Sequence, residues 1–206
     1  PDTASPRSDA GAYVPSVQGS TLEADRIFMP EQEMGSEYTV ITAFSLADPQ
    51  EQTDSRAVFG SAGLCYVSGE NIYVTESCYD TDDSDVTRTA IRKVAYHDGL
   101  LEGAAQTKID GLLNDSFSID EYNGYLRLVT TISSENGVMP ISRESSPAEP
   151  DTSNALYVLD GELQLVGEIG DLAPGETVYS ARFMGDTGYF VTFRQVDPLF
   201  SADLSD

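Results

Sequence analysis

A run of closely spaced acidic side chains is the first candidate for chemistry in this sequence. Residues 80–85 contain four aspartates, interleaved with hydroxyl side chains: Asp80, Asp82, Asp83 and Asp85. Oxygen donors at this density are ligands that Ca²⁺ accepts. The run nevertheless lacks the glycine at position six and the closing glutamate at position twelve of an EF-hand loop. A solvated acidic loop that prevents strands from associating at their edges is the alternative interpretation.

A second candidate site consists of charged residues within or beside apolar strand-like runs: Arg182, Arg194 and Asp197. One interpretation is a binding cluster that contacts a ligand. The other is a set of ion pairs between neighbouring sheets, where such charges are retained when they are paired. Four tyrosines near expected turns are interpreted as packing between sheets rather than as a sugar-stacking platform: Tyr122, Tyr125, Tyr179 and Tyr189.

Nucleophilic and acid–base catalysis have little support in this sequence. Its one histidine, His97, precedes the turn-forming pair Asp98-Gly99, and no G-x-S-x-G motif is present. Carboxylate pairs such as Glu168 and Asp171 could serve glycoside hydrolysis at a separation of about 5–10 Å. Among 35 acidic residues such pairs arise by chance. We therefore expect no enzyme, with a carboxylate-cluster hydrolase as the alternative.

The composition argues against several partners. The net charge is −24, from 35 acidic and 11 basic residues, and such a surface repels nucleic acid and anionic membranes. No apolar run approaches the roughly 20 residues of a transmembrane helix. Cys65 and Cys78 belong to no C-x-x-C motif, and we expect two separate thiols, with a disulfide as the alternative.

The elements that would position these residues are strands that recur along the chain. Three strand-like runs pass through a short turn into a second run, at residues 63–75, 116–130 and 179–194. Further strand-like runs cover residues 38–46, 88–96, 154–159 and 199–204, and each is followed by an aspartate suited to capping a turn: Asp48, Asp98, Asp160 and Asp206. A repeat of about 40–50 residues with four short strands is typical of a β-propeller blade.

We therefore predict an all-β chain of the β-propeller type, with about three four-stranded blades and the first strand of another. The expected ranges are an irregular segment or the end of a preceding blade at 1–37, blades at 38–86, 87–153 and 154–198, and the start of the next blade at 199–206. The proline- and serine-rich residues 133–153 are interpreted as an insertion. Helical periodicity is weak throughout, and the best helix candidate is residues 100–105. The strand 199–204 would have an open edge, through which the chain could self-associate.

Two stretches, residues 117–127 and 166–200, resemble a family of secreted prokaryotic proteins with a β-propeller distantly related to WD40 repeats. The resemblance runs from about residue 38 to the end and is most specific over residues 178–200. It implies a prokaryotic protein outside the cytoplasm, longer than this chain, and it carries over no catalytic residue.

These observations predict a non-catalytic extracellular β-propeller module. Its expected role is to bind a protein or carbohydrate ligand, or to serve as a structural module at the cell surface. The alternatives are a hydrolase that acts through a carboxylate cluster and a calcium-dependent adhesion domain. No cofactor is expected apart from calcium at residues 80–85.

Overall fold

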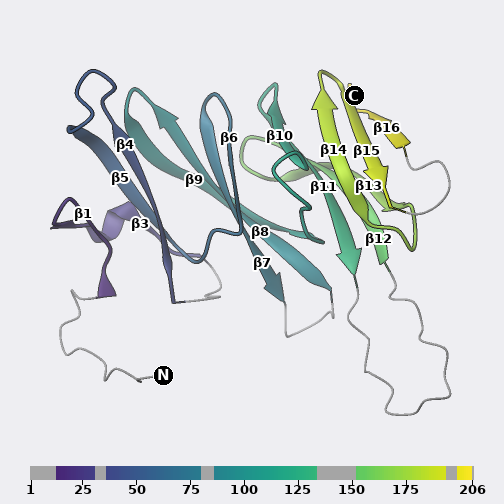
Figure 1. Cartoon of the computed structure of the whole chain (residues 1–206), viewed down its shortest axis with the longest axis horizontal. Helices are drawn as coiled ribbons and strands as arrows, with labels where there is room; N and C mark the ends of the chain where they lie inside the picture. The colour runs from purple at the N-terminus through teal and green to yellow at the C-terminus, as the bar shows by residue number, and fades with distance from the viewer. Residues whose placement is uncertain (1–12, 31–35, 80–85, 134–151, 194–198, 206) are drawn as a thin grey trace, which may run out of the picture. The chain divides into compact units, whose positions relative to one another are not determined.

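The computed structural model describes residues 13–30, 36–79, 86–133, 152–193 and 199–205. These residues form strands joined by turns, together with the short 3₁₀ turn η2 (Ala24–Arg26), so the all-β prediction is confirmed (Figure 1). The chain divides into two compact units. One contains Pro1–Ala62 and Val94–Gly103, and the other contains Gly63–Lys93 and Ala104–Asp206.

The first unit contains a three-stranded sheet with the order β3-β5-β4. Strands β4 (Tyr38–Phe44) and β5 (Gln52–Phe59) are antiparallel, and β3 (Ile27–Phe28) pairs with β5 in parallel. A small hairpin of β1 (Ser16–Val17) and β2 (Ser20–Thr21) and the 3₁₀ turn η2 (Ala24–Arg26) precede β3. The segment 1–37, expected to be irregular or the end of a preceding blade, therefore contributes a strand to this sheet.

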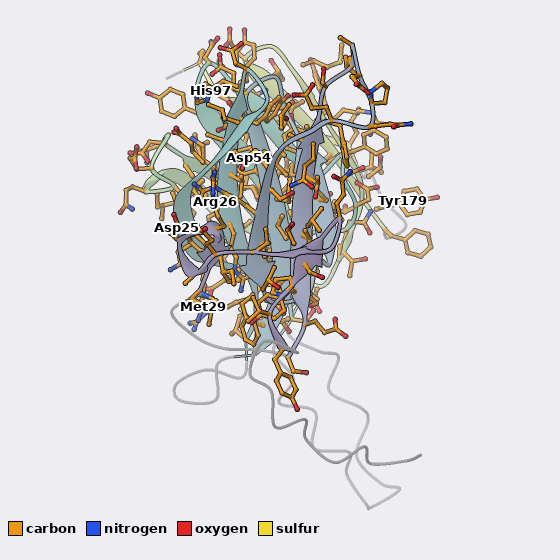
Figure 2. All side chains as sticks on the ribbon, turned by 90° about the vertical axis from the view of Figure 1, so that its left-hand side faces the viewer. Asp25, Arg26, Met29, Asp54, His97 and Tyr179 are labelled. Atoms are coloured by element: carbon orange, nitrogen blue, oxygen red, sulfur yellow. The ribbon has the colours of Figure 1, made fainter. Side chains whose placement is uncertain are left out.

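A buried carboxylate fixes the elements of the first unit. The Asp54 side chain accepts hydrogen bonds from the backbone N–H groups of Ser55 and Leu101, both at 2.8 Å. Arg26 completes the arrangement with an ion pair to Asp54 at 3.1 Å (Figure 2). Because a buried charge is tolerated only when it is paired and hydrogen-bonded, these contacts stabilise β5 against both neighbouring segments.

Three antiparallel sheets follow along the chain, two of four strands and one of three. One has the order β6-β7-β8-β9, one β10-β11-β12-β13 and one β14-β15-β16. The strands are β6 (Leu64–Val67), β7 (Asn71–Tyr79), β8 (Thr87–His97), β9 (Leu100–Asp110), β10 (Ile119–Tyr122), β11 (Tyr125–Ser133), β12 (Thr152–Leu159), β13 (Leu165–Leu172), β14 (Val178–Met184), β15 (Thr187–Thr192) and β16 (Leu199–Asp203).

The three expected hairpins are present as β6–β7, β10–β11 and β14–β15, and each opens a sheet. The sheets group the strands differently from the expected ranges, because the boundary between residues 153 and 154 falls inside strand β12. That strand pairs with β11 over eight positions, from Leu126↔Leu159 to Ser133↔Thr152. The helix candidate at residues 100–105 lies in strand β9, where its glycine and small residues extend a long antiparallel strand.

Strands β11 and β12 contribute apolar side chains to both faces of the sheet β10–β13, as in sheets that are covered on both sides. One face contributes Leu126, Leu128 and Tyr157 to a core with Ile91 and other residues of the preceding sheet. The other face contributes Val129 and Leu156 to a core with the sheet β14–β16: Val178, Ala181, Phe190 and Ala202. Sheets stacked face to face therefore form these two apolar cores of the second unit.

Both cysteine side chains are thiols, as expected, with Cys65 exposed and Cys78 buried. Desolvation raises the pKa of the Cys65 thiol above its ordinary value. Among the residues that the structure describes, no helix has the length and apolarity needed to span a membrane.

Candidate functional site

An exposed cation–aromatic stack lies on strand β14. The guanidinium carbon of Arg182 is 3.4 Å from the centroid of the Phe117 ring, and its Nη1 donates a hydrogen bond to the carbonyl oxygen of Ala181 at 2.9 Å. A cation over an aromatic ring at an exposed site contributes about 0.5–1 kcal/mol. The stack therefore fixes two side chains that solvent can reach.

Two more aromatic rings lie on β14 and directly after β15. Tyr179 is 65% exposed and Phe193 is 74% exposed, and their ring centroids are 6.2 Å apart. The side-chain amide of Asn114 donates a hydrogen bond to the carbonyl oxygen of Tyr179 at 3.0 Å. The Tyr179 ring points away from the ribbon into solvent, not into packing between sheets (Figure 2). We call Phe117, Tyr179, Arg182 and Phe193 the aromatic surface.

A pocket of about 530 Å³ lies between the sheets β10–β13 and β14–β16. Its walls are apolar where β12 and β13 contribute Leu156, Val158 and Ile169. Its charged lining consists of one arginine and three carboxylates: Arg127, Glu168, Asp186 and Asp203. The pocket is thus apolar along one sheet and mainly acidic around its rim.

Arg127 lines this pocket and joins the two sheets that form it. Its side chain pairs with Asp120 on the same sheet, and its Nη1 donates a hydrogen bond to the carbonyl oxygen of Gly185 in the β14–β15 turn. The guanidinium carbon also lies 4.6 Å from the Tyr122 ring centroid and 5.1 Å from the Phe183 ring centroid. Arg127 is 3% exposed, and its Nε has no hydrogen-bond partner among the described residues.

Glu121 joins the preceding pair of sheets in a similar way. Its carboxylate accepts hydrogen bonds from the Ser68 hydroxyl at 2.6 Å, the Asn71 amide at 3.0 Å and the Tyr73 hydroxyl at 2.9 Å. Its backbone N–H donates to the Tyr66 hydroxyl oxygen at 3.1 Å. Burial, followed by the hydrogen bond to Glu121, raises the pKa of Tyr73 above its ordinary value. The Glu121 carboxylate therefore joins the β10–β11 hairpin, on which it lies, to the β6–β7 hairpin.

The sequence model of the β-propeller domain family matches residues 2–206. The chain belongs to the β-propeller domain family. The predicted β-propeller-type fold is thus confirmed, and each of the stacked sheets is a blade or part of one.

Two archaeal proteins are similar to this β-propeller chain. An uncharacterized protein of Archaeoglobus fulgidus is 38% identical over 122 residues, which cover 59% of this chain and 16% of that protein. An uncharacterized protein of Methanocaldococcus jannaschii is 39% identical over 99 residues, which cover 48% of this chain and 14% of that protein. The matched stretches are therefore a small part of each relative.

The predicted binding cluster is placed only in part. Arg182 lies on the blade β14–β16 and stacks on Phe117, which comes from the segment before β10. Arg194 and Asp197 lie outside the described residues, so their place beside Arg182 stays a prediction. His97 is exposed at the β8–β9 turn (Figure 2).

The predicted calcium ligands Asp80, Asp82, Asp83 and Asp85 also lie outside the described residues. Within the ranges that the structure does describe, no group of three or more His, Cys, Asp or Glu side chains is placed to hold a metal ion. The calcium site therefore stays a prediction from the sequence.

Sequence reasoning missed Arg127, Glu121 and the pocket. A signal for Arg127 was present, because it lies between Leu126 and Leu128 in an apolar strand, just as Arg182 lies between Ala181 and Phe183. The partners gave no such signal. Asn71 lies 50 residues before Glu121 and Gly185 lies 58 residues after Arg127, so only the stacking of blades brings them together.

Proposed function

We propose that this chain is a non-catalytic module of an extracellular β-propeller protein and binds a protein ligand through the aromatic surface. The observation that carries the proposal is a pair of exposed aromatic contacts at β14, with Arg182 over the Phe117 ring and the Tyr179 ring beside Phe193. Large aromatic side chains are usually mostly buried, and a surface patch that leaves several of them exposed marks an interaction site. Aromatic residues and arginine are also the types enriched at the energetic centres of protein interfaces.

Contacts within the protein hold part of the aromatic surface. Arg182 fixes the Phe117 ring, and Asn114 fixes the backbone at Tyr179. Binding then costs less side-chain entropy than it would with mobile rings. Phe117 stays 51% exposed although the following blade is in place, so the packing of blades does not remove this position from solvent.

The extracellular location rests on the resemblance to secreted prokaryotic proteins and is supported by the net charge of −24. Such a charge suits a surface that stays soluble and repels anionic polymers. It also favours a ligand that is neutral or basic where it meets the module.

The test begins with capture of ligands from proteins released from the cell surface, using the purified chain. A captured protein is then purified and its affinity is measured by calorimetry. Truncation of a residue at the centre of an interface costs about 2 kcal/mol or more, so we expect Phe193→Ala and Tyr179→Ala each to weaken binding at least tenfold.

Tyr125→Ala is the matched control, because Tyr125 is 45% exposed and lies outside the aromatic surface. Equal losses for the control and for Phe193→Ala would contradict the proposal. If the chain binds glycans on an array and the same two variants lose this binding, the ligand is a carbohydrate and not a protein. Measured turnover abolished by one substitution would show an enzyme instead.

A further inference from the structure

A second, smaller pocket lies at the sheet β6–β9, beside the segment that leads into β10, and measures about 190 Å³. Three hydroxyl side chains and one amide line it: Thr75, Ser77, Thr89 and Asn114. Its apolar walls are Leu64 and Leu113, which pack against a buried core of the second unit. Among the described residues no charged side chain lines this pocket. We call it the hydroxyl pocket.

The two buried threonines of the hydroxyl pocket offer hydrogen-bond acceptors, because their hydroxyl hydrogens are already used. The Thr75 hydroxyl donates to the carbonyl oxygen of Leu64 at 3.1 Å, and the Thr89 hydroxyl donates to the carbonyl oxygen of Gly111 at 2.7 Å. Both threonines are 3% exposed. A hydroxyl group has one hydrogen and two acceptor lone pairs. Each of these oxygens can therefore still accept a hydrogen bond from a ligand.

Asn114 adds a further acceptor and connects the hydroxyl pocket to the aromatic surface. Its amide nitrogen donates to the carbonyl oxygen of Tyr179 at 3.0 Å and to Asp115 Oδ2 at 3.3 Å. Since a side-chain amide has two hydrogens, its oxygen is the group that remains for a ligand. Phe117 follows three residues later, and its N–H donates to Asp115 Oδ1 at 2.9 Å. The segment 114–117 thus contributes to both the hydroxyl pocket and the aromatic surface.

We propose that the hydroxyl pocket receives a lysine side chain of the protein that binds the aromatic surface. This inference rests on the proposed function and names a residue that the partner must supply. An ammonium group carries three donors and no acceptor, which matches the oxygens of Thr75, Thr89 and Asn114. The aliphatic stem of the lysine packs against Leu64 and Leu113.

The size and the chemistry of the hydroxyl pocket favour a lysine over other groups. Sites for whole small molecules measure about 300–1,000 Å³, so this pocket suits a single side chain. A carboxylate would bring acceptors to a pocket of acceptors, in a chain whose net charge is −24. Three separate side-chain oxygens suit the rotatable donors of an ammonium better than the fixed planar fork of an arginine. The Asp115 carboxylate, which accepts from Asn114, supplies the opposite charge beside the pocket.

The first experiment titrates the isotopically labelled 206-residue chain with n-butylammonium, which is a lysine side chain without its backbone. The same titration with n-butyrate provides an anion with the same number of carbons. We expect butylammonium to give saturable chemical-shift changes at residues 64, 75, 89, 113 and 114, and butyrate to give none there. This measurement uses no partner protein, so its result does not depend on the proposed function.

Thr75→Val keeps the shape of the side chain and removes one acceptor oxygen. Losing one hydrogen bond to a charged group should weaken butylammonium binding about tenfold. Thr39→Val is the matched control, because the Thr39 hydroxyl also donates to a backbone carbonyl, that of Gly60 at 3.0 Å, and does not line the pocket. Equal binding by the two variants, or shifts confined to residues outside the pocket, would overturn the proposal. If Thr75→Val does not fold, Thr89→Val takes its place, and the shifts of the unaltered chain decide independently.

The second experiment uses the protein that is captured through the aromatic surface, before and after acetylation of its lysines, which removes their charge. Thr75→Val should weaken binding of the untreated partner about tenfold and leave binding of the acetylated partner unchanged, because both changes remove the same contact. An equal effect of Thr75→Val on both forms would overturn the proposal. If blocking the partner's N-terminal amine alone abolishes the effect, a chain terminus and not a lysine occupies the pocket.

The two proposals fail in different ways. Partner binding that is lost in Phe193→Ala and unchanged in Thr75→Val would refute the lysine contact and leave the aromatic surface as the binding site. Partner binding that is weakened by Thr75→Val and unchanged in Phe193→Ala and Tyr179→Ala would refute the role of the aromatic surface and support the pocket.

Discussion

Two leucines occupy the same register position in neighbouring blades and have opposite environments. Leu156 lies opposite Val129 on the blade β10–β13, and Leu199 lies opposite Val191 on the blade β14–β16. Leu156 is 1% exposed and Leu199 is 66% exposed. The two hairpins share their register, so the local strand does not cause the difference. Whether a blade residue is buried depends on whether a further sheet packs on it.

The largest predicted effect tests this pair directly. Leu156→Ala removes a side chain from a filled core and should lower the free energy of unfolding by about 3 kcal/mol. Leu199→Ala should change it by no more than about 0.5 kcal/mol, as for most surface substitutions. Urea denaturation of both variants measures the difference. Similar losses of unfolding free energy in the Leu156→Ala and Leu199→Ala variants would contradict the comparison.

Two matching positions on strands β11 and β15 provide the second test, one of them charged and buried. Arg127, opposite Asp120, corresponds to Tyr189, opposite Arg182. Arg127→Ala leaves the partly buried Asp120 carboxylate without its cation and should cost about 3 kcal/mol. Tyr189 is 39% exposed, and Tyr189→Ala should cost no more than about 1 kcal/mol.

Arg127→Met separates packing from charge in the same urea experiments. It keeps most of the side-chain volume, so a loss of unfolding free energy equal to that of Arg127→Ala would show that the ion pair and the contacts of the guanidinium with Tyr122 and Phe183 matter more than the apolar volume of the side chain. A recovery of most of the stability would show the reverse.

We expect the free energy of unfolding to fall at high pH through Tyr157 on β12, whereas the matching position on β16 makes no such contribution. Burial, and next the charge of Glu168, raises the pKa of Tyr157 to about 12. Since the folded pKa lies above the unfolded value of about 10, Tyr157 stabilises the fold below pH 10 and loses this contribution as the pH rises toward 12. The matching position on β16 is Phe200, which has no phenol.

Denaturation midpoints between pH 8 and 12 test this difference, with phenolate absorbance as a second readout. Tyr157→Phe should reduce the decline in stability above pH 10. An unchanged decline in this variant would show that other tyrosines, with Tyr73 the first candidate, account for the alkaline limit.

The smallest predicted effect concerns the turn after β12 at Asp160 and the turn after β16 at Asp203. These turns occupy matching positions, because Leu159 pairs with Leu126 and Ala202 pairs with Gly188 at matching positions of their hairpins. Asp160 Oδ1 accepts hydrogen bonds from two backbone N–H groups, so Asp160→Ala should cost about 1 kcal/mol. Asp203 accepts one from Ser205, which lowers the pKa of its carboxyl, so this turn is held at neutral pH and weakens as the pH falls through that lowered value. Asp203→Ala should therefore lower the thermal midpoint less than Asp160→Ala, by calorimetry. A larger effect of Asp203→Ala would contradict the matching of the turns.

The sequence was sufficient for features that arise between near neighbours. The hairpins and the Asp48 and Asp160 turns follow from turn chemistry and alternating apolar residues, and the structure contains both. The sheets group the strands differently from the predicted blade ranges, because β11 pairs with β12 across residues 134–151. Glu121 likewise depends on partners in an earlier hairpin, and nothing in its local sequence indicates them.

The pairing of Ser133 with Thr152 has a practical consequence for anyone who works with the protein. The two ends of residues 134–151 are held together as opposite members of a ladder, so the closure of this connection is already enforced by β11 and β12. Each doubling of the length of a closed loop adds only about 0.6 kcal/mol to the entropic cost of closing it. An affinity tag, a fluorophore or a small reporter domain can therefore be inserted between these two strands without separating Ser133 from Thr152.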